Sequence, residues 1–249
     1  RREPSPRHRG VFQGGRTRPP SGDYAESTRH RGAVHKGQLV SLRVAVLDYE
    51  MSNLRSAAKA LERLGAEVTI ARTPEEMAGA EAVVLPGDGH FGEAMRRLRA
   101  AGLDRAVIAA AGAGTPVLGI CIGLQVLFES SDEEPGVAGL GLLRGAVRRL
   151  QTDAKIPHIG WAQVRWSERA PIATTDPGDS STYYFLHSFA VEPTDRAACW
   201  GAADHGVPFC AIAGEGNVMG VQFHPEKSSR SGLALLQRWL VHVDAAVTA

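Results

Sequence analysis

One cysteine of the chain lies where a catalytic nucleophile is expected. Cys121 is central in the segment 119–123 (GICIG), which follows the apolar run Val117–Ile120 and precedes the helical-looking stretch Leu124–Phe128. A nucleophile between glycines at a strand-to-helix turn projects above the sheet, and the positive potential of a helix N-terminus favours its thiolate form. The pattern predicts a reactive thiol at Cys121.

A thiolate that attacks an amide needs a base to hold its proton and return it to the leaving amine. His224 suits this role because the apolar run 218–223 delivers it from an expected strand, and imidazole titrates in the right range. Pro225 makes the next step rigid, and Glu226 lies near enough to orient the ring. The sequence therefore predicts a triad of Cys121, His224 and Glu226.

The other cysteines and histidines lack such surroundings. Cys199 and Cys210 lie in β-like stretches without flanking glycines, so we expect small buried side chains. No CxxC or Cys/His spacing indicates a disulfide framework or a metal site, and a reducing cytoplasm is expected. We assign His8, His30, His35, His205 and His242 to the core or the surface, and keep His90, His158 and His187 as possible supports of the site.

Composition excludes several classes of function. The chain has 249 residues and 43% hydrophobic side chains, which is enough for one large α/β domain. Residues 1–42 contain nine Lys/Arg and three Asp/Glu, which leaves nineteen and twenty-four for residues 43–249. A mildly acidic body offers no basic face for nucleic acid. No apolar run is long enough to span a bilayer, and we expect a soluble protein that is not exported.

The N-terminal segment 1–42 is expected to be disordered. It is rich in Arg, Gly, Pro, Ser and His, with too few large apolar side chains to offset the entropy lost on ordering. We interpret it as an inert extension; an arm for an anionic partner is the alternative. The ordered domain is expected over residues 43–249.

Apolar runs then alternate with amphipathic stretches, a pattern typical of a parallel, doubly wound sheet. Strands are expected at 43–47, 68–70, 82–85 and 117–120, and helices at 94–101, 104–111 and after a Ser52 N-cap, with Leu54, Ala58, Leu61 and Leu64 on one face. After about Gly139 we expect β segments at 163–166, 182–186, 209–213 and 218–223, and then a closing helix with Leu233, Leu236, Leu240 and Val243 on its inner face.

With the motifs 119–125 (GICIGLQ) and 222–228 (QFHPEKS), the chain resembles the class I glutamine amidotransferases. That resemblance implies an α/β, flavodoxin-like fold, with a central, mostly parallel sheet flanked by helices and an additional antiparallel β portion. It also implies hydrolysis of L-glutamine to glutamate and ammonia through a thioester on Cys121, with no cofactor and no metal.

Further motifs are similar to those of the glutaminase subunits of imidazole glycerol phosphate synthase, an enzyme of histidine biosynthesis. These motifs are 48–49 (DY), 53–56 (NLRS), 86–92 (PGDGHFG), 128–131 (FESS), 157–161 (PHIGW), 184–188 (YFLHS) and 227–228 (KS). The partner that this resemblance implies is the cyclase subunit, a (β/α)8 barrel that takes up the ammonia and forms imidazole glycerol phosphate.

The oxyanion donors are expected to be the backbone N–H of Ile122 and an amide of the segment Pro86–Gly89, which includes Gly87 and Asp88. By resemblance, the residues that bind glutamine are Gly87, Gly89, Gln125, Glu133, Ser188 and Phe189, and those at the subunit interface are Asn53, Trp161, Tyr184 and Lys227.

Four positions depart from the family pattern. Glu50 and Ser52 stand where glycines are usual, Ala162 where asparagine is usual, and Phe189 where tyrosine is common. Three alternatives stay open: another class I glutaminase, serving pyridoxal phosphate, anthranilate, GMP or CTP synthesis; an inactive regulatory relative; and a hydrolase similar to cysteine peptidases.

Overall fold

The computed structural model of the chain describes residues 42–51, 53–173 and 181–248. The expected disorder of the N-terminal segment lies outside these residues, except at Leu42. Leu42 is buried, and its carbonyl accepts a hydrogen bond of 2.8 Å from the Glu67 amide. Leu42 is therefore tied to the β-sheet by a backbone hydrogen bond.

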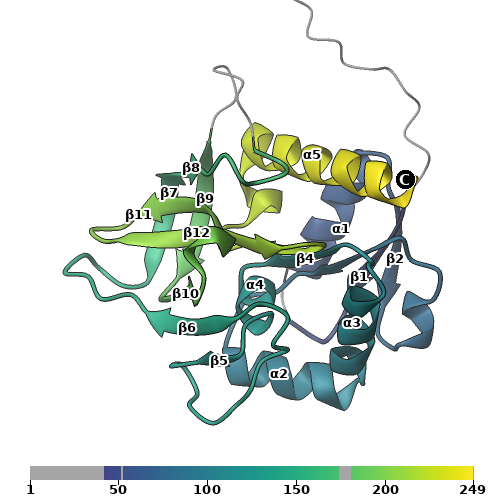
Figure 1. Cartoon of the computed structure of the whole chain (residues 1–249), viewed down its shortest axis with the longest axis horizontal. Coiled ribbons are helices and arrows are strands. Elements are labelled where there is room, and N and C mark those ends of the chain that lie inside the picture. The colour runs from purple at the N-terminus through teal and green to yellow at the C-terminus, as the bar shows by residue number, and fades with distance from the viewer. Residues whose placement is uncertain (1–41, 52, 174–180, 249) are drawn as a thin grey trace, which may run out of the picture. The chain divides into compact units, whose positions relative to one another are not determined.

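A parallel sheet forms the centre of this body (Figure 1). Its strands run in the order β2-β1-β3-β4-β13, and each neighbouring pair is parallel. Their bounds are β1 Arg43–Leu47, β2 Glu67–Ala71, β3 Ala82–Leu85, β4 Val117–Ile120 and β13 Val218–Val221. The first four were expected from the sequence, and β13 ends two residues before the predicted 223.

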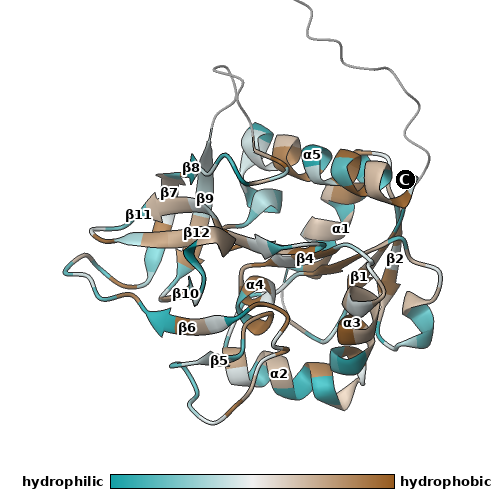
Figure 2. Ribbon diagram, in the orientation of Figure 1, coloured by the Kyte–Doolittle hydropathy of each residue, from teal (hydrophilic) through white to brown (hydrophobic). Residues whose placement is uncertain are grey.

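Alternating side chains of the central strands enter two separate cores. In β1, Val44 and Val46 pack into one core, whereas Ala45 and Leu47 pack into the other. Successive strand residues point to opposite faces, so a strand buried on both faces must be apolar at every position. Figure 2 shows the resulting brown colour along β1 and β4.

Helices cover both faces of the sheet (Figure 1). Helix α1 (Leu54–Arg63) and helix α5 (Ser229–Val247) contribute to the first core, and α2 (Phe91–Ala100) with α3 (Leu103–Gly112) to the second. The predicted closing helix is confirmed. The predicted N-cap is wrong: Asn53, in a left-handed conformation with φ of 76°, precedes α1, while Ser52 lies outside the described residues.

An antiparallel portion extends the sheet beyond β13. Strand β12 (Pro208–Glu215) pairs antiparallel with β13, β10 (Phe189–Pro193) and β11 (Cys199–Asp204), as Figure 1 shows. Beyond these lie β6 (Gly145–Arg149), β5 (Ser130–Ser131) and β8 (Arg165–Trp166), and β7 (His158–Gln163) pairs with β9 (Thr182–His187) in a sheet of two strands. The segment expected as one strand at 163–166 is divided between β7 and β8, because the chain leaves one sheet for the other at Val164.

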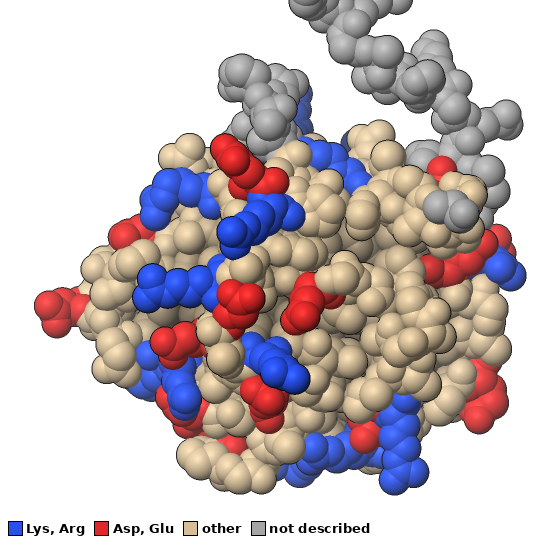
Figure 3. Space-filling view, in the orientation of Figure 1, with Lys and Arg blue, Asp and Glu red and all other residues tan. Residues whose placement is uncertain are grey.

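The remaining described elements are short: α4 (Ile122–Val126) and the 3₁₀ turns η1 (Glu75–Met77), η2 (Arg196–Ala198) and η3 (Pro225–Lys227). Within the described residues, no helix combines the length and the apolar character needed to cross a membrane. On the face seen in Figure 3, basic and acidic side chains are interspersed.

Candidate active site

Cys121 occupies a strained turn between β4 and α4. Its φ of 55° and ψ of −106° lie outside the regions that most residues adopt. Two glycines make this turn possible: a Cβ on Gly123 would lie 1.8 Å from the Leu85 carbonyl oxygen, and one on Gly119 would lie 2.5 Å from the Gly123 oxygen. The predicted nucleophile elbow is therefore present, with Cys121 at the N-terminus of α4.

His224 follows β13 and is held by its backbone. Its amide donates to the Tyr184 carbonyl at 2.9 Å, and its own carbonyl accepts from the Ser228 hydroxyl at 2.6 Å. Nδ1 lies 2.8 Å from Oε1 of Glu226, and both side chains are almost fully buried. Glu226 thus fixes the ring orientation and leaves Nε2 for the nucleophile.

The charge of the His224 ring is set by these neighbours. Burial disfavours the imidazolium, but interactions with the Cys121 sulfur and the Glu226 carboxylate outweigh it and raise the pKa of His224 from 6.5 to about 10. Nε2 has no hydrogen-bond partner among the described residues. The arrangement favours the imidazolium form of His224.

The expected oxyanion segment lies beside the elbow. A Cβ on Gly87 would lie 2.6 Å from Cγ2 of Ile122 and 2.7 Å from the Tyr49 hydroxyl, so no side chain fits there. Gly89 has a positive φ of 121°, which glycine adopts readily. Tyr49, which the sequence analysis did not assign to the site, is buried and donates to the Pro86 carbonyl at 2.8 Å. Burial raises the pKa of this phenol, so it remains a donor.

A pocket of about 380 Å³ opens onto the Cys121 thiol. It brings together most of the residues that resemblance assigns to glutamine binding, although they come from separate parts of the chain. Its lining is Asp88, Gly89, Cys121, Ile122, Gln125, Glu133, Pro157, Leu186, His187, Ser188 and Phe189. Gly87 is buried and is not part of this lining.

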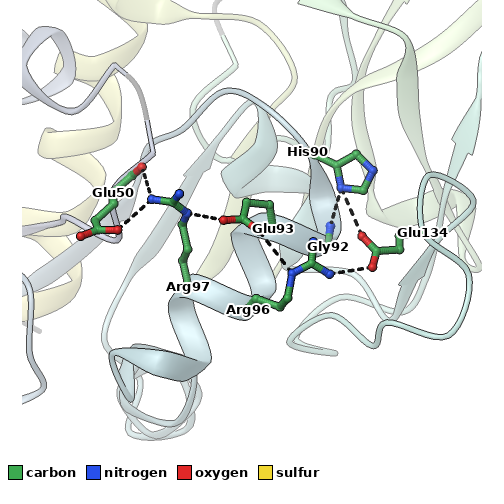
Figure 4. A network of polar contacts seen from close by, with 7 residues as sticks. All are labelled: Glu50, His90, Gly92, Glu93, Arg96, Arg97 and Glu134. Atoms are coloured by element: carbon green, nitrogen blue, oxygen red, sulfur yellow. Dashed lines mark hydrogen bonds and ion pairs between the residues drawn. The ribbon is translucent and has the colours of Figure 1, made fainter.

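Glu133 and Glu134 have different surroundings. Glu133 lines the pocket, and its Oε2 accepts from the Phe91 amide at the start of α2 at 2.7 Å. Glu134 instead joins the polar network of Figure 4, where it contacts Arg96 at 2.6 Å and His90 at 3.3 Å. Of the two carboxylates, Glu133 therefore faces the pocket, and His90 lies in a surface network.

The predicted interface residues fall into two groups. Trp161 and Tyr184 pack edge to face on the β7–β9 sheet at a centroid distance of 6.0 Å, with Trp161 54% exposed. Lys227 is exposed in η3. Asn53 lies deeper, with its Nδ2 3.3 Å from Oδ2 of Asp88 and 3.2 Å from Nδ1 of His224. It therefore connects Asp88, in the predicted oxyanion segment, with His224.

Three positions that depart from the family pattern lie near these groups. Glu50 has a φ of 60°, a glycine-like conformation, and its carboxylate lies 2.8 Å from Arg97 (Figure 4). Ala162 pairs with Tyr183 across β7 and β9. Phe189 uses its carbonyl, which accepts from Gln125 at 3.1 Å and contacts Nδ1 of His187 at 2.8 Å, so a tyrosine hydroxyl is not needed for this contact.

The histidines kept as supports behave differently from one another. His158 and His187 are buried and hydrogen-bonded at 3.1 Å, and His205 stacks on His158 at 4.1 Å. His187 reaches the pocket lining; His205, expected to be an ordinary core or surface group, instead joins this cluster. Cys210 is buried as expected, whereas Cys199 is partly exposed. The described residues contain no group of three or more possible metal ligands.

Comparison with known proteins places this site in a family. The family model described as glutamine amidotransferase class-I matches residues 45–243. The chain belongs to this family. The match includes Cys121, His224 and Glu226, the three residues that the sequence predicts as a triad.

Similar glutamine amidotransferases include proteins named imidazole glycerol phosphate synthase subunit HisH. The relative from Moorella thermoacetica is 44% identical over 196 residues, 79% of this chain and 93% of that protein. The one from Bacillus subtilis is 40% identical over 203 residues, with coverage of 79% and 94%. A solved structure titled PurLQS from Thermotoga maritima shares the fold, with a TM-score of 0.66, 23% identity and coverage of 81% and 99%.

Proposed function

We propose that the chain is the glutaminase subunit of an imidazole glycerol phosphate synthase, which hydrolyses L-glutamine and passes ammonia to a cyclase subunit. The observation that carries this proposal is the Glu226–His224 pair beside Cys121, in a chain 40–45% identical to subunits that bear this name. We expect the reaction to take place in the cytoplasm.

The first half of the reaction forms a thioester. The Cys121 thiolate attacks the side-chain amide carbon of glutamine, and the negative charge moves to the amide oxygen. Collapse of the tetrahedral intermediate breaks the C–N bond, and Nε2 of His224 gives its proton to the leaving amine. Ammonia leaves, and the γ-glutamyl group stays on sulfur.

The second half reverses the proton transfer. His224 removes a proton from water, and the resulting hydroxide attacks the thioester carbonyl. The C–S bond breaks, glutamate leaves, and the thiolate and imidazolium pair is restored. Glu226 holds Nδ1 throughout and stabilises the charged ring.

Donors for the two oxyanions come from backbone on both sides of the sulfur. The Ile122 amide at the start of α4 is one donor, and an amide of Gly87, Asp88 or Gly89 is the other. The absence of a side chain on Gly87 lets this backbone approach the reacting carbon.

The residues expected to select glutamine are those of the pocket that would bind its amino-acid head group. Both hydrogens of the Gln125 amide are engaged, by the Phe189 carbonyl and by Oε1 of Gln222, so Oε1 of Gln125 is left to accept from the substrate α-ammonium. Glu133 adds a negative charge for the same group, and the Ser188–Phe189 backbone forms the opposing wall.

The partner follows from the chemistry of the product. Ammonia released into water near neutral pH is protonated and ceases to be a nucleophile, so direct transfer to a cyclase with a (β/α)8 barrel fits the reaction. The exposed Trp161 and Lys227, with Tyr184, form the expected docking side, and Asn53 lies between that side and His224.

The test compares glutamine with free ammonia as nitrogen donor. Cys121→Ala should abolish glutamine-dependent product formation with purified cyclase, while ammonia-dependent cyclisation by the cyclase stays unchanged. Cys199→Ala, at a partly exposed thiol outside the pocket lining, is the matched control. Glutaminase activity retained in Cys121→Ala would refute the nucleophile; a fast, unchanged rate of the isolated wild type with and without cyclase would refute the coupling.

A further inference from the structure

A chain of buried hydrogen bonds runs from the Phe189 carbonyl to the Cys121 sulfur. Nε2 of Gln125 donates to the Phe189 oxygen and to Oε1 of Gln222, both at 3.1 Å. Nε2 of Gln222 then lies 3.7 Å from Sγ of Cys121, within reach of a hydrogen bond to sulfur. Gln222 is fully buried and Gln125 nearly so, which keeps water from competing for these groups.

The direction of this chain is determined by its anchor. A carbonyl oxygen only accepts hydrogen bonds, so the Gln125 amide must turn its NH₂ group toward Phe189. The second hydrogen of that group then meets Gln222, which must present its oxygen. The NH₂ group of Gln222 is consequently turned toward the Cys121 sulfur.

Two histidines hold the anchor in place. Nδ1 of His187 lies 2.8 Å from the Phe189 oxygen and must donate to it, so Nε2 of the same ring is an acceptor. That nitrogen lies 3.1 Å from Nδ1 of His158, which pairs with His187 across β7 and β9. Every donor in the hydrogen-bonded chain that runs from His158 through His187 and Phe189 to Gln222 therefore faces an acceptor.

We propose that Gln222 is a catalytic residue that donates a hydrogen bond to the Cys121 thiolate and holds it in the pocket. The Leu186 carbonyl, 3.8 Å from the sulfur, accepts from a protonated thiol but repels a thiolate, so a second donor beside His224 stabilises the ionised form. Gln222 supplies that donor from β13's end, two residues before His224. This inference rests on the proposed role of Cys121 as nucleophile.

Alkylation of Cys121 by iodoacetamide tests the inference without glutamine. The thiolate displaces iodide and forms an S–C bond, so the rate reports the thiolate fraction. Gln222→Met keeps an unbranched side chain but removes the donor. We expect its alkylation rate at pH 7 to fall about tenfold, as for the loss of one hydrogen bond to a charged group, and its rate at pH 10 to stay close to that of the wild type.

Peptide mass spectrometry separates Cys121 from Cys199 and Cys210, and Met219→Leu, a buried change on β13, controls for altered packing. Equal rates at pH 7 in Gln222→Met and wild type would overturn the role of Gln222 and leave the proposed function intact. A Cys121 that does not alkylate in the wild type would overturn both.

Should Gln222→Met not fold, the native chain gives a second measurement. We expect alkylation of Cys121 to move the side-chain amide resonances of Gln222 more than those of Gln163, an exposed residue of β7. Gln222 resonances that stay in place would overturn the inference.

Discussion

Two groups of buried imidazoles in this molecule have opposite pKa shifts. At the end of β13, His224 has a pKa raised from 6.5 to about 10. On β7 and β9, His158 and His187 have pKa values lowered to about 4 and about 3. All three side chains are buried, so burial by itself does not decide the charge of the ring.

The difference lies in the neighbours. His224 interacts with the Glu226 carboxylate and with the Cys121 sulfur, and these interactions outweigh the cost of burying its charge. Burial is the largest cause of the lowered pKa values of His158 and His187, and nearby imidazoles add to it. His224 therefore stabilises the fold below pH 6.5, and this contribution is lost as pH rises through about 10. His158 and His187 contribute stability above pH 6.5, which is lost as pH falls through about 4 and about 3.

The largest expected effect follows from removing the charge of Glu226. Glu226→Gln keeps the shape but can present its NH₂ group to Nδ1, which favours the wrong tautomer of His224. We expect kcat to fall roughly 10⁴-fold, as for an Asp-to-Asn change in a related triad, and the pKa of His224 to fall. Steady-state kinetics and NMR titration of His224 measure these effects.

Glu215→Gln, an exposed change at the end of β12, is the control for Glu226→Gln. If Glu226→Gln lowered kcat less than about tenfold while the pKa of His224 fell, the raised pKa would not matter for catalysis. In that case the opposite pKa shifts of the two groups of histidines would be unrelated to catalysis.

Whether the sequence predicts a contact in the site depends on how far apart the two residues lie along the chain. The elbow at Cys121 and the pair of His224 with Glu226 are local, since glycine and proline fix the backbone within a few residues. The strands were predictable because burial on both faces requires continuous apolar runs. The contacts of Gln222 with Gln125 and Cys121, and of His187 with His158, were not, because these partners lie 97, 101 and 29 residues away along the chain.

The N-cap of α1 and the role of Tyr49 show the same limit. Ser52 has a typical capping side chain, but the chain begins its helix after Asn53, which instead contacts Asp88 and His224 through tertiary structure. Tyr49 reaches Pro86 across 37 residues. Glycine at 87, required by Tyr49 and Ile122, was the signal in the sequence that could have indicated a close neighbour.

Acid stability provides the second prediction. The lowered pKa of His158 contributes stability that is complete above about pH 6.5 and is lost as pH falls through about 4, where roughly 3 kcal/mol has gone. His158→Phe keeps the aromatic contact with Phe185 but cannot titrate. We expect a variant that is less stable at pH 7 and loses less of its unfolding free energy between pH 6.5 and 4.

Urea unfolding at several pH values measures this difference, and His242→Gln on α5 is the matched control. A His158→Phe variant with the same loss of stability in acid as the wild type would show that the cluster does not bury neutral imidazole. The lowered pKa values would then be wrong, and the contrast with His224 would disappear.

A smaller effect is expected at Asn53, the third group near His224. Since the Nδ1–H group donates its hydrogen bond to Glu226, it cannot accept one from Asn53, and the Asn53 amide serves chiefly to hold Asp88 of the predicted oxyanion segment. Asn53→Ala should lower kcat/KM about three- to tenfold, as for one partly buried hydrogen bond, and leave the pKa of His224 almost unchanged. Lys59→Ala, an exposed change on α1, is the control; a large fall in that pKa would contradict this interpretation.

The smallest effect concerns His205, which stacks on His158 at 4.1 Å and whose Nε2 lies 2.9 Å from the Lys155 carbonyl. Its charge in acid opposes that of His158, so His205→Gln should raise the pKa of His158 part of the way toward 6.5. Loss of the stack should cost about 0.5–1.5 kcal/mol at pH 7. NMR titration of His158 measures this effect. An unchanged pKa would mean that burial alone keeps the His158 ring neutral. Neighbouring groups would then explain the pKa shift of His224 but not that of His158.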